Sequence, residues 1–172
     1  AIHHLLLYDF GIHWFDFCAA IFPGQTPVSV RARVSAAPGQ RPRPPLLAQA
    51  VIDYPQAQAR ISLNGNVLHG QQDTTTICGT RGTVRSVGPS LSEQSVTLHT
   101  AAGTATPALE GTWFESGFQG AMGELLCAVE EGRAPLHAAR ENLRGLALCF
   151  AACASADVGG VPIVPGNARR AP

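Results

Sequence analysis

The spacing of apolar and polar residues predicts a helix near the start of the chain. Residues 5–22 are apolar and aromatic apart from three polar positions, and they end at Pro23-Gly24. Proline and glycine stop helices, so this pattern predicts a helix from about Asp9 to Ala20. Asp9 would then lie near the helix N-terminus, where a carboxylate can cap free N–H groups.

The middle of the chain changes to the period of β-strands. Residues 28–34 alternate apolar and polar side chains, and the four prolines of residues 37–45 make the next segment a loop. Further short runs predict strands over residues 48–53, 57–63, 74–78, 83–87, 95–100 and 104–108. Asn64-Gly65 predicts a tight hairpin turn before Val67-Leu68. Short strands at hairpin spacing indicate a largely antiparallel sheet.

The last third of the chain returns to helical spacing. One helix is predicted by a stripe of five apolar residues: Phe118, Met122, Leu125, Leu126 and Val129. Ser116 and Gln119 have the spacing of a capping box at its start, and Gly132 follows its end. A second helix is predicted over residues 138–156, with a buried face of Leu143, Leu146, Ala147, Phe150 and Ala154.

This order of elements, a helix followed by strands and then two helices, is typical of the α+β class. We expect an open, mostly antiparallel sheet with helices packed on one face. A chain of 172 residues is long enough for one domain with a substantial core. The sequence therefore predicts a single domain over residues 1–172.

Charge and composition exclude several classes of function. The 12 acidic residues balance the 12 basic ones, so no large field favours nucleic acid or an anionic membrane. No apolar run reaches the roughly 20 residues of a membrane span. The chain has no lysine, so its own residues cannot supply lysine chemistry. Its 5 cysteines are scattered without a C-x-x-C pair, which argues against a disulfide framework and fits a reducing cytoplasm.

The strongest candidate for chemistry is the pair Asp9 and His13. Four residues apart on a helix, they share one face, and a histidine exchanges protons near neutral pH beside a carboxylate that can orient it. Gly11 between them gives up helix propensity worth about 1 kcal/mol, which suggests a close approach to the backbone there. Asp16 lies near the same face and is expected to play a supporting role. The alternative is that Asp9 is only a helix cap and His13 only an interface histidine.

Other motifs are weaker or missing. The aromatic run from Trp113 to Phe118 can pack in the core or line a sugar site, because aromatic faces stack on sugar C–H surfaces. No G-x-G-x-x-G loop follows a strand, so no dinucleotide-binding residues are expected in this chain. His3-His4 has no third ligand at metal-site spacing, and no metal site is expected. No G-x-S-x-G nucleophile motif occurs.

Taken in order, these segments resemble a known family, the C-terminal domain of the glucose–fructose oxidoreductase / inositol dehydrogenase (Gfo/Idh/MocA) family. Tyr8–Asp16 looks like the D-x-G-x-H-x-x-D helix of that family, and Ile77–Thr83 is similar to its GTxG hairpin. The resemblance continues through Gly111–Leu126, Glu131–Pro135, Glu141–Leu143, Ser155–Ala156 and Pro165–Gly166. Each segment is short, but the ordered set is specific.

The resemblance implies a two-domain enzyme that transfers a hydride between a sugar or polyol hydroxyl carbon and NAD or NADP. An N-terminal Rossmann domain, absent from this chain, would bind the dinucleotide, and this chain would bind the substrate. By resemblance, His13 is the acid/base or its relay, and Asp9 positions the substrate and the imidazole. The candidate substrate-binding residues are Trp14, Asp16, Trp113 and Phe114. The open sheet face would join subunits into homodimers or tetramers.

The chain departs from the family pattern at points that bear on activity. The family's lysine, in a Glu-Lys-Pro motif ahead of this domain, is absent, and so is the usual first strand, so the isolated chain is expected to be inactive. Ala138 stands where the family often has a serine cap. Two alternatives remain open: a non-catalytic binding or assembly module on the same scaffold, and a hydrolase or lyase relative that uses the nicotinamide transiently.

Overall fold

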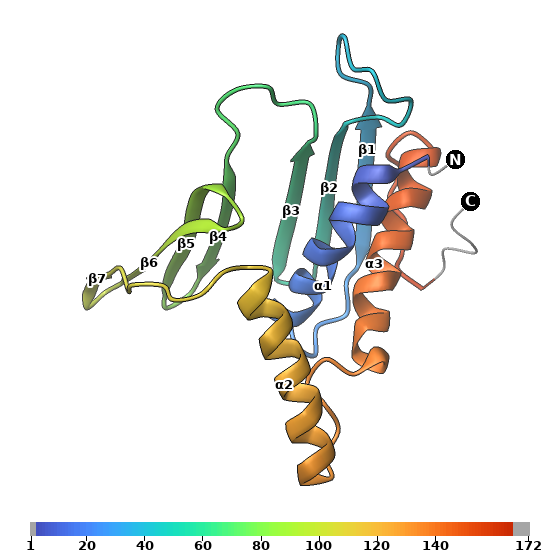
Figure 1. Cartoon of the computed structure of the whole chain (residues 1–172). Helices are drawn as coiled ribbons and strands as arrows, with labels where there is room; N and C mark the ends of the chain where they lie inside the picture. The colour runs from blue at the N-terminus through green and yellow to red at the C-terminus, as the bar shows by residue number, and fades with distance from the viewer. Residues whose placement is uncertain (1–2, 167–172) are drawn as a thin grey trace. The chain divides into compact units, whose positions relative to one another are not determined.

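The computed structural model describes residues 3–166 (Figure 1). Their contacts form two compact units, one made of the residues up to Asn66 together with those from His137 onward, the other of Val67–Leu136. The first unit contains η1 (Leu6–Phe10), α1 (Gly11–Ile21), β1 (Ser29–Ser35), β2 (Leu47–Tyr54), β3 (Ala57–Asn64) and α3 (Ala139–Asp157). The second contains β4 (Asp73–Gly79), β5 (Gly82–Ser90), β6 (Glu93–Thr100), β7 (Gly103–Ala105) and α2 (Glu115–Glu131). The predicted α+β class is confirmed, and the prediction of a single domain stays a prediction.

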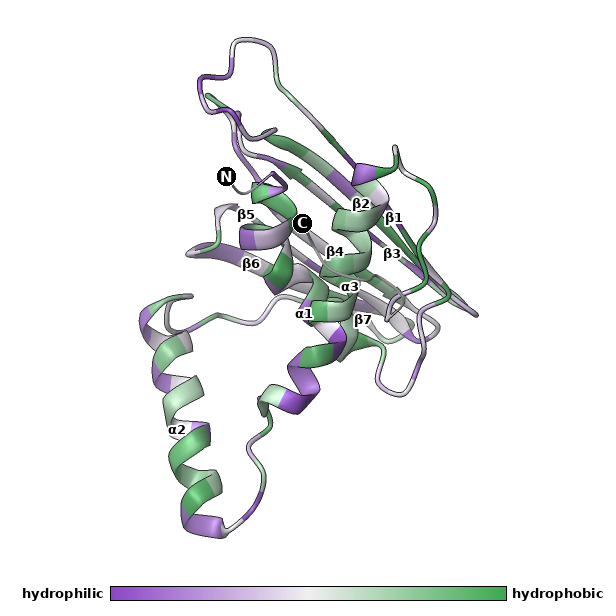
Figure 2. Ribbon diagram, turned by 90° about the vertical axis from the view of Figure 1, so that its right-hand side faces the viewer, coloured by the Kyte–Doolittle hydropathy of each residue, from purple (hydrophilic) through white to green (hydrophobic). Residues whose placement is uncertain are grey.

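In the first unit, two helices cover one face of an antiparallel sheet with the strand order β1-β2-β3 (Figure 1). The alternation predicted for residues 28–34 is confirmed from Val30 onward, where Val30 and Ala32 point into the core and Arg31 is exposed. At its start the prediction is wrong, since Val28 is 53% exposed and Ser29 is buried. Phe15 of α1, Ile52 of β2 and Leu148 of α3 are almost completely buried and join the two layers. Figure 2 shows hydrophobic residues along both of these helices.

The buried face of α3 differs from the predicted one. The residues that pack inward are mostly small, namely Gly145, Leu148, Cys149, Ala151, Ala152, Cys153 and Ser155. Leu143, expected in the core, is 60% exposed. Small side chains let α3 approach α1 and β1 closely. The close packing of this face stabilises the helix in this orientation more than burial of the bulkier predicted stripe would. The helix itself ends within one residue of its predicted end.

The hairpin predicted at Asn64-Gly65 is wrong. β3 follows β2 through a turn in which Tyr54 pairs with Ala57, and it then leaves the sheet at Asn64. The side chain of Asn64 accepts a hydrogen bond of 2.9 Å from the backbone N–H of Asn66, which forms an Asx turn. Asn-Gly is therefore a strand end here, and the next strand begins only at Asp73.

In the second unit, the four strands form an antiparallel sheet in the order β4-β5-β6-β7. The hairpin spacing of the predicted strands is confirmed for 74–78 with 83–87 and for 95–100 with 104–108. Gly79 lies opposite Gly82 at the first turn and Thr100 opposite Gly103 at the second. The strand predicted over 104–108 is shorter, since β7 ends at Ala105.

Helix α2 of the second unit has its predicted period but not its predicted cap. Gly132 ends it in the left-handed conformation, with φ of 64°. Its N-cap residue is Phe114, and Ser116 instead accepts a hydrogen bond of 2.9 Å from the backbone N–H of Thr112, so the predicted capping box is wrong. The predicted apolar stripe stays exposed, with Phe118 at 68% and Val129 at 73%.

Candidate functional site

The segment that carries Asp9 and His13 is one continuous helix with a widened first part. Residues Leu6–Phe10 form a π-helical turn, and the backbone N–H of Gly11 donates to the carbonyl of Leu6, five residues back. The helix therefore begins three residues before the predicted start, and Asp9 does not cap it, because the N-cap residue is Leu5. Single π-helical turns inside α-helices occur frequently at functional sites.

Gly11 is buried where the π-helical turn joins α1. A Cβ atom at this position would lie 3.0 Å from the Leu6 carbonyl oxygen and 3.3 Å from the ring of Phe15. The close backbone approach expected at Gly11 is therefore present, and the chain's own carbonyl and ring make it. A larger residue at this position would therefore press on the turn that carries Asp9.

The side chains of Asp9 and His13 are both exposed. Among residues 3–166, neither of them takes part in a hydrogen bond or an ion pair. Both therefore keep their full hydrogen-bonding capacity for a ligand. The imidazole can donate or accept a hydrogen bond through its ring nitrogens, and the carboxylate accepts hydrogen bonds from hydroxyl groups.

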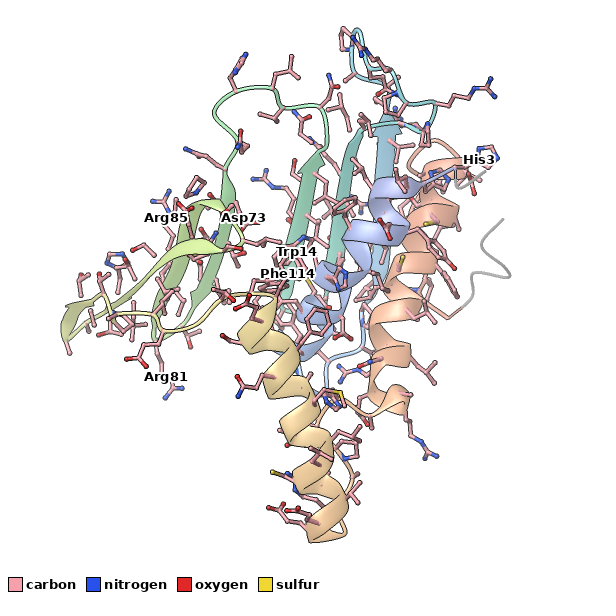
Figure 3. All side chains as sticks on the ribbon, in the orientation of Figure 1. His3, Trp14, Asp73, Arg81, Arg85 and Phe114 are labelled. Atoms are coloured by element: carbon pink, nitrogen blue, oxygen red, sulfur yellow. The ribbon has the colours of Figure 1, made fainter. Side chains whose placement is uncertain are left out.

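Two other candidates on the same helix are half-buried. Trp14 lies on α1, packs against the core and meets Phe17 edge-to-face with ring centroids 6.1 Å apart (Figure 3). Asp16 is in close contact with Gly145 of α3. A Cβ atom built on that glycine would be 2.8 Å from an Asp16 carboxylate oxygen. Both residues are thus less exposed than Asp9 and His13.

Trp113 and Phe114 belong to the second unit, where they precede and cap α2. Figure 3 labels Phe114 at the start of this helix. They are 47% and 58% exposed, so neither lies in the core of that unit. Phe114 stacks on Phe118 at 6.3 Å between ring centroids. Asp9, His13 and their neighbours are therefore together on one helix, and these two aromatic residues are on a different unit.

Two contacts that the sequence did not predict attach the start of this helix to α3. His4 is buried, and its Nε2 atom lies 2.7 Å from a carboxylate oxygen of Asp157. Beside it, the thiol of Cys149 donates to the carbonyl of Leu7 at 3.3 Å. His4 and Asp157 are 153 residues apart in sequence, so no local motif could have indicated the pair.

The described residues do not fit a dinucleotide or a metal ion. Within residues 3–166, no three His, Cys, Asp or Glu side chains are grouped so that they could hold a metal. All strand pairs of the two sheets are antiparallel, so these sheets contain no βαβ unit whose helix N-terminus would receive a pyrophosphate. No described helix is long and apolar enough to cross a membrane.

Comparison with known proteins gives a family match and a fold match. Residues 3–85 match the family model described as "GFO/IDH/MocA C-terminal domain". An oxidoreductase from Agrobacterium radiobacter, solved with NAD+, L-tartaric acid and magnesium, is similar with a TM-score of 0.78 and 18% identity, over 95% of this chain and 50% of that one. None of the curated proteins compared with the chain matches it.

Two further solved structures have the same fold. A putative myo-inositol dehydrogenase from Sinorhizobium meliloti gives a TM-score of 0.67 and 21% identity, over 94% of this chain and 50% of that one. UDP-N-acetylglucosamine 3-dehydrogenase from Acidithiobacillus ferrooxidans gives 0.68 and 15%, over 86% and 45%. The chain thus spans about half the length of the solved structures that it matches.

Proposed function

We propose that this chain is the substrate-binding part of an NAD(P)-dependent oxidoreductase. The proposal is supported by the match of residues 3–85 to the family model of the GFO/IDH/MocA C-terminal domain. The reaction would transfer a hydride between a sugar or polyol hydroxyl carbon and nicotinamide. The names of the inositol and amino-sugar dehydrogenases of the same fold support this substrate class. Since the described residues do not fit a dinucleotide, a Rossmann domain outside these 172 residues would bind it.

The observation that carries the proposal is the exposed pair Asp9 and His13 at the junction of η1 and α1. Oxidation of a hydroxyl group releases its proton, and a histidine is the side chain best suited to take a proton at neutral pH. His13 would be that base or its relay. Asp9 would accept a hydrogen bond from a neighbouring hydroxyl group or from the imidazole, and so fix the geometry of both.

Other residues would shape the substrate site. The half-buried residues Trp14 and Asp16 would form the floor of this site, and Asp16 would act through position rather than through contact with the reacting atoms. Trp113 and Phe114 offer exposed rings that suit the C–H faces of a sugar. We place the protein in the cytoplasm, since 5 free cysteines suit a reducing compartment.

We also propose that the chain forms homodimers or tetramers through a sheet face. In the second unit, Val84 of β5 and Leu98 of β6 stand directly opposite each other and are 36% and 40% exposed. Paired aliphatic residues exposed on an open sheet are suited to burial against a second copy. Light scattering of the wild-type chain and of Leu98→Glu tests this proposal. The wild type should have the mass of an oligomer and the variant a lower mass, and equal masses would contradict the proposal.

The function is tested on the intact protein that carries this chain. NAD(P)H formation is measured with a panel of polyols and sugars, in the wild type and in His13→Ala, His13→Gln and His69→Ala. His69 is an exposed histidine in a loop of the second unit and serves as the control. Loss of the base should lower kcat/KM by about 10²- to 10⁴-fold in both His13 variants and leave the His69 variant unchanged.

Three outcomes contradict the proposal in different ways. An intact protein without a dinucleotide-binding βαβ unit would remove the cofactor from the reaction. Equal turnover of His13→Ala and wild type would favour a non-catalytic role for this helix. Conversion of substrate without net accumulation of NADH would indicate a hydrolase or lyase instead.

A further inference from the structure

The first unit contains a cavity at the end of α1 remote from Asp9. Its volume is about 260 Å³, and the end of α1, the loop after it, the last residue of β2, the first half of α3 and residues 164–166 line it. None of the candidate site residues named above is among the lining residues. The cavity is therefore independent of the proposed active site.

The walls of the cavity are mainly apolar. Ala19, Ala147, Leu148 and Val164 supply aliphatic surface, and no aspartate or glutamate takes part in the lining. The volume is below the range of about 300–1,000 Å³ that is usual for drug-sized ligands. Such a space suits a molecule with a short hydrocarbon chain.

Tyr54 brings an unsatisfied polar group to this cavity. The residue is only 7% exposed, and within residues 3–166 its hydroxyl group has no hydrogen-bond partner. Most buried polar side-chain atoms are hydrogen-bonded, and leaving one unpaired costs about 1–3 kcal/mol. Its ring is fixed against Phe22, with ring centroids 4.4 Å apart, so the hydroxyl group cannot swing out to water without breaking this contact.

Arg144 brings an uncompensated positive charge to the same place. One of its guanidinium nitrogens donates to the carbonyl of Phe22 at 3.2 Å, and no ion pair of this arginine exists among the described residues. Arg144 and Tyr54 both line the cavity. Burial and the charge of Cys18 raise the pKa of Tyr54 to about 12, and the charge of Arg144 acts against this rise. A guanidinium has five N–H donors in a planar fork, which matches a carboxylate.

We propose that this cavity binds a small organic acid, with the carboxylate held by Arg144 and Tyr54 and the short alkyl chain against Ala19, Leu148 and Val164. The guanidinium pairs with the anion, and the tyrosine hydroxyl donates the hydrogen bond that it lacks within the chain. A carboxylate is favoured over a phosphate because the lining offers one cation and much apolar surface.

The test uses the 172-residue chain and three probes of equal length: butyrate, 1-butanol and butylammonium. Binding is followed by NMR, through the methyl signals of Ala19 and Val164. Butyrate should bind saturably, and the neutral and cationic probes should bind at least about tenfold more weakly, since hydrogen bonds to a charged group are the stronger ones. Inorganic phosphate is the fourth probe.

Variants separate the two polar contacts. Arg144→Met should weaken butyrate binding about tenfold or more, and Tyr54→Phe, which keeps the ring, should weaken it about threefold to tenfold. Arg140→Met is the matched control, one turn earlier on the exposed face of α3, and should bind as the wild type does. Circular dichroism checks that each variant folds.

Several results would overturn the proposal. These are the absence of saturable butyrate binding, equal binding of butyrate and 1-butanol, tighter binding of phosphate than of butyrate, and unchanged butyrate binding in Arg144→Met. If Tyr54→Phe does not fold, the Arg144 and Arg140 variants decide alone. Since turnover is not measured, these results are independent of the outcome for His13.

Discussion

Gly145 of α3 lies directly against the backbone of Asp16 in α1. A Cβ atom built on Gly145 would be only 2.7 Å from the Cα atom of Asp16, a distance that side-chain motion cannot relieve because the contact is with the backbone. The two helices thus cross at a point where only glycine fits. This crossing holds α1, the helix that carries Asp16 and His13, against α3.

Gly145→Ala should therefore destabilise the protein, although alanine is the better helix former. The gain in helix propensity is about 1 kcal/mol, and forcing extra volume into a packed contact costs typically about 1–3 kcal/mol before any shift of the helices. We expect a lower urea midpoint in chemical unfolding. Gly120→Ala on α2 is the control, since nothing lies within 4 Å of its added Cβ atom, and it should be neutral or stabilising.

Ser155 gives a second test of the packing of α3. Its hydroxyl oxygen accepts a hydrogen bond of 2.9 Å from the backbone N–H of Ala32 in β1, and its O–H donates to the carbonyl of Val161 at 2.7 Å. Ser155→Ala leaves a buried N–H without a partner, and the free energy of unfolding should fall by about 1–3 kcal/mol. Ser62→Ala, on the exposed side of β3, should change it by less than about 0.5 kcal/mol. Equal effects of the two substitutions would contradict this role of Ser155.

The sequence predicted the elements better than it predicted what they bury. Helical spacing located α3 to within one residue, yet its bulky stripe is not the buried face. Hydrophobic periodicity weighs residues by size and polarity, whereas the close crossing at Gly145 and Asp16 selects small residues. A stripe of small residues is visible in the sequence at Gly145, Cys149 and Ala152. It can be recognised as a buried face only when the helix that packs against it is known.

Features that depend on distant residues could not be predicted. The Asp9–His13 pair could be proposed from the sequence because both residues lie within one turn, and its role stays a prediction. The π-helical turn that carries Asp9 depends on Leu7 and His4 meeting α3 more than 140 residues later. The cavity at Tyr54 and Arg144 likewise brings together residues that are far apart in the sequence. Local chemistry is readable from spacing, whereas long-range contacts require the fold.

Asp53 makes stability depend on pH. Hydrogen bonds donated by Gln58 and Ser29, together with the charge of Arg31, hold the pKa of its carboxyl group below the usual value. Because the folded-state pKa is the lower one, this stabilisation is fully present above the unfolded value of about 3.9 and is lost as pH falls through the folded value.

Asp53→Asn should therefore be less stable than the wild type at pH 7, and the difference should shrink steadily below pH 4. Urea unfolding at several pH values measures this. Asp73→Asn is a control of opposite sign, since burial raises the pKa of Asp73 and its charged form is disfavoured in the folded state. A difference for Asp53→Asn that stays constant with pH would show that the lost contacts, and not the charge, matter.

The five cysteines should fall into two classes of reactivity. Cys78 and Cys127 are exposed, whereas Cys18, Cys149 and Cys153 are buried. The thiolate is the reactive form, and burial raises the pKa of Cys18 to about 11, so it is almost wholly protonated at neutral pH. The neighbouring thiol of Cys153 and burial also raise the pKa of Cys149.

Iodoacetamide labelling of the native chain at pH 8, read by mass spectrometry, should modify Cys78 and Cys127 rapidly and the other three only after unfolding in urea. The variant Cys78→Ser with Cys127→Ser should then show no rapid labelling. Rapid labelling of Cys149 in that variant would mean that the η1 turn, whose Leu7 carbonyl accepts from its thiol, opens readily in the folded protein. Such opening would also unfix Asp9, so this experiment tests whether the candidate site is held in place before a ligand arrives.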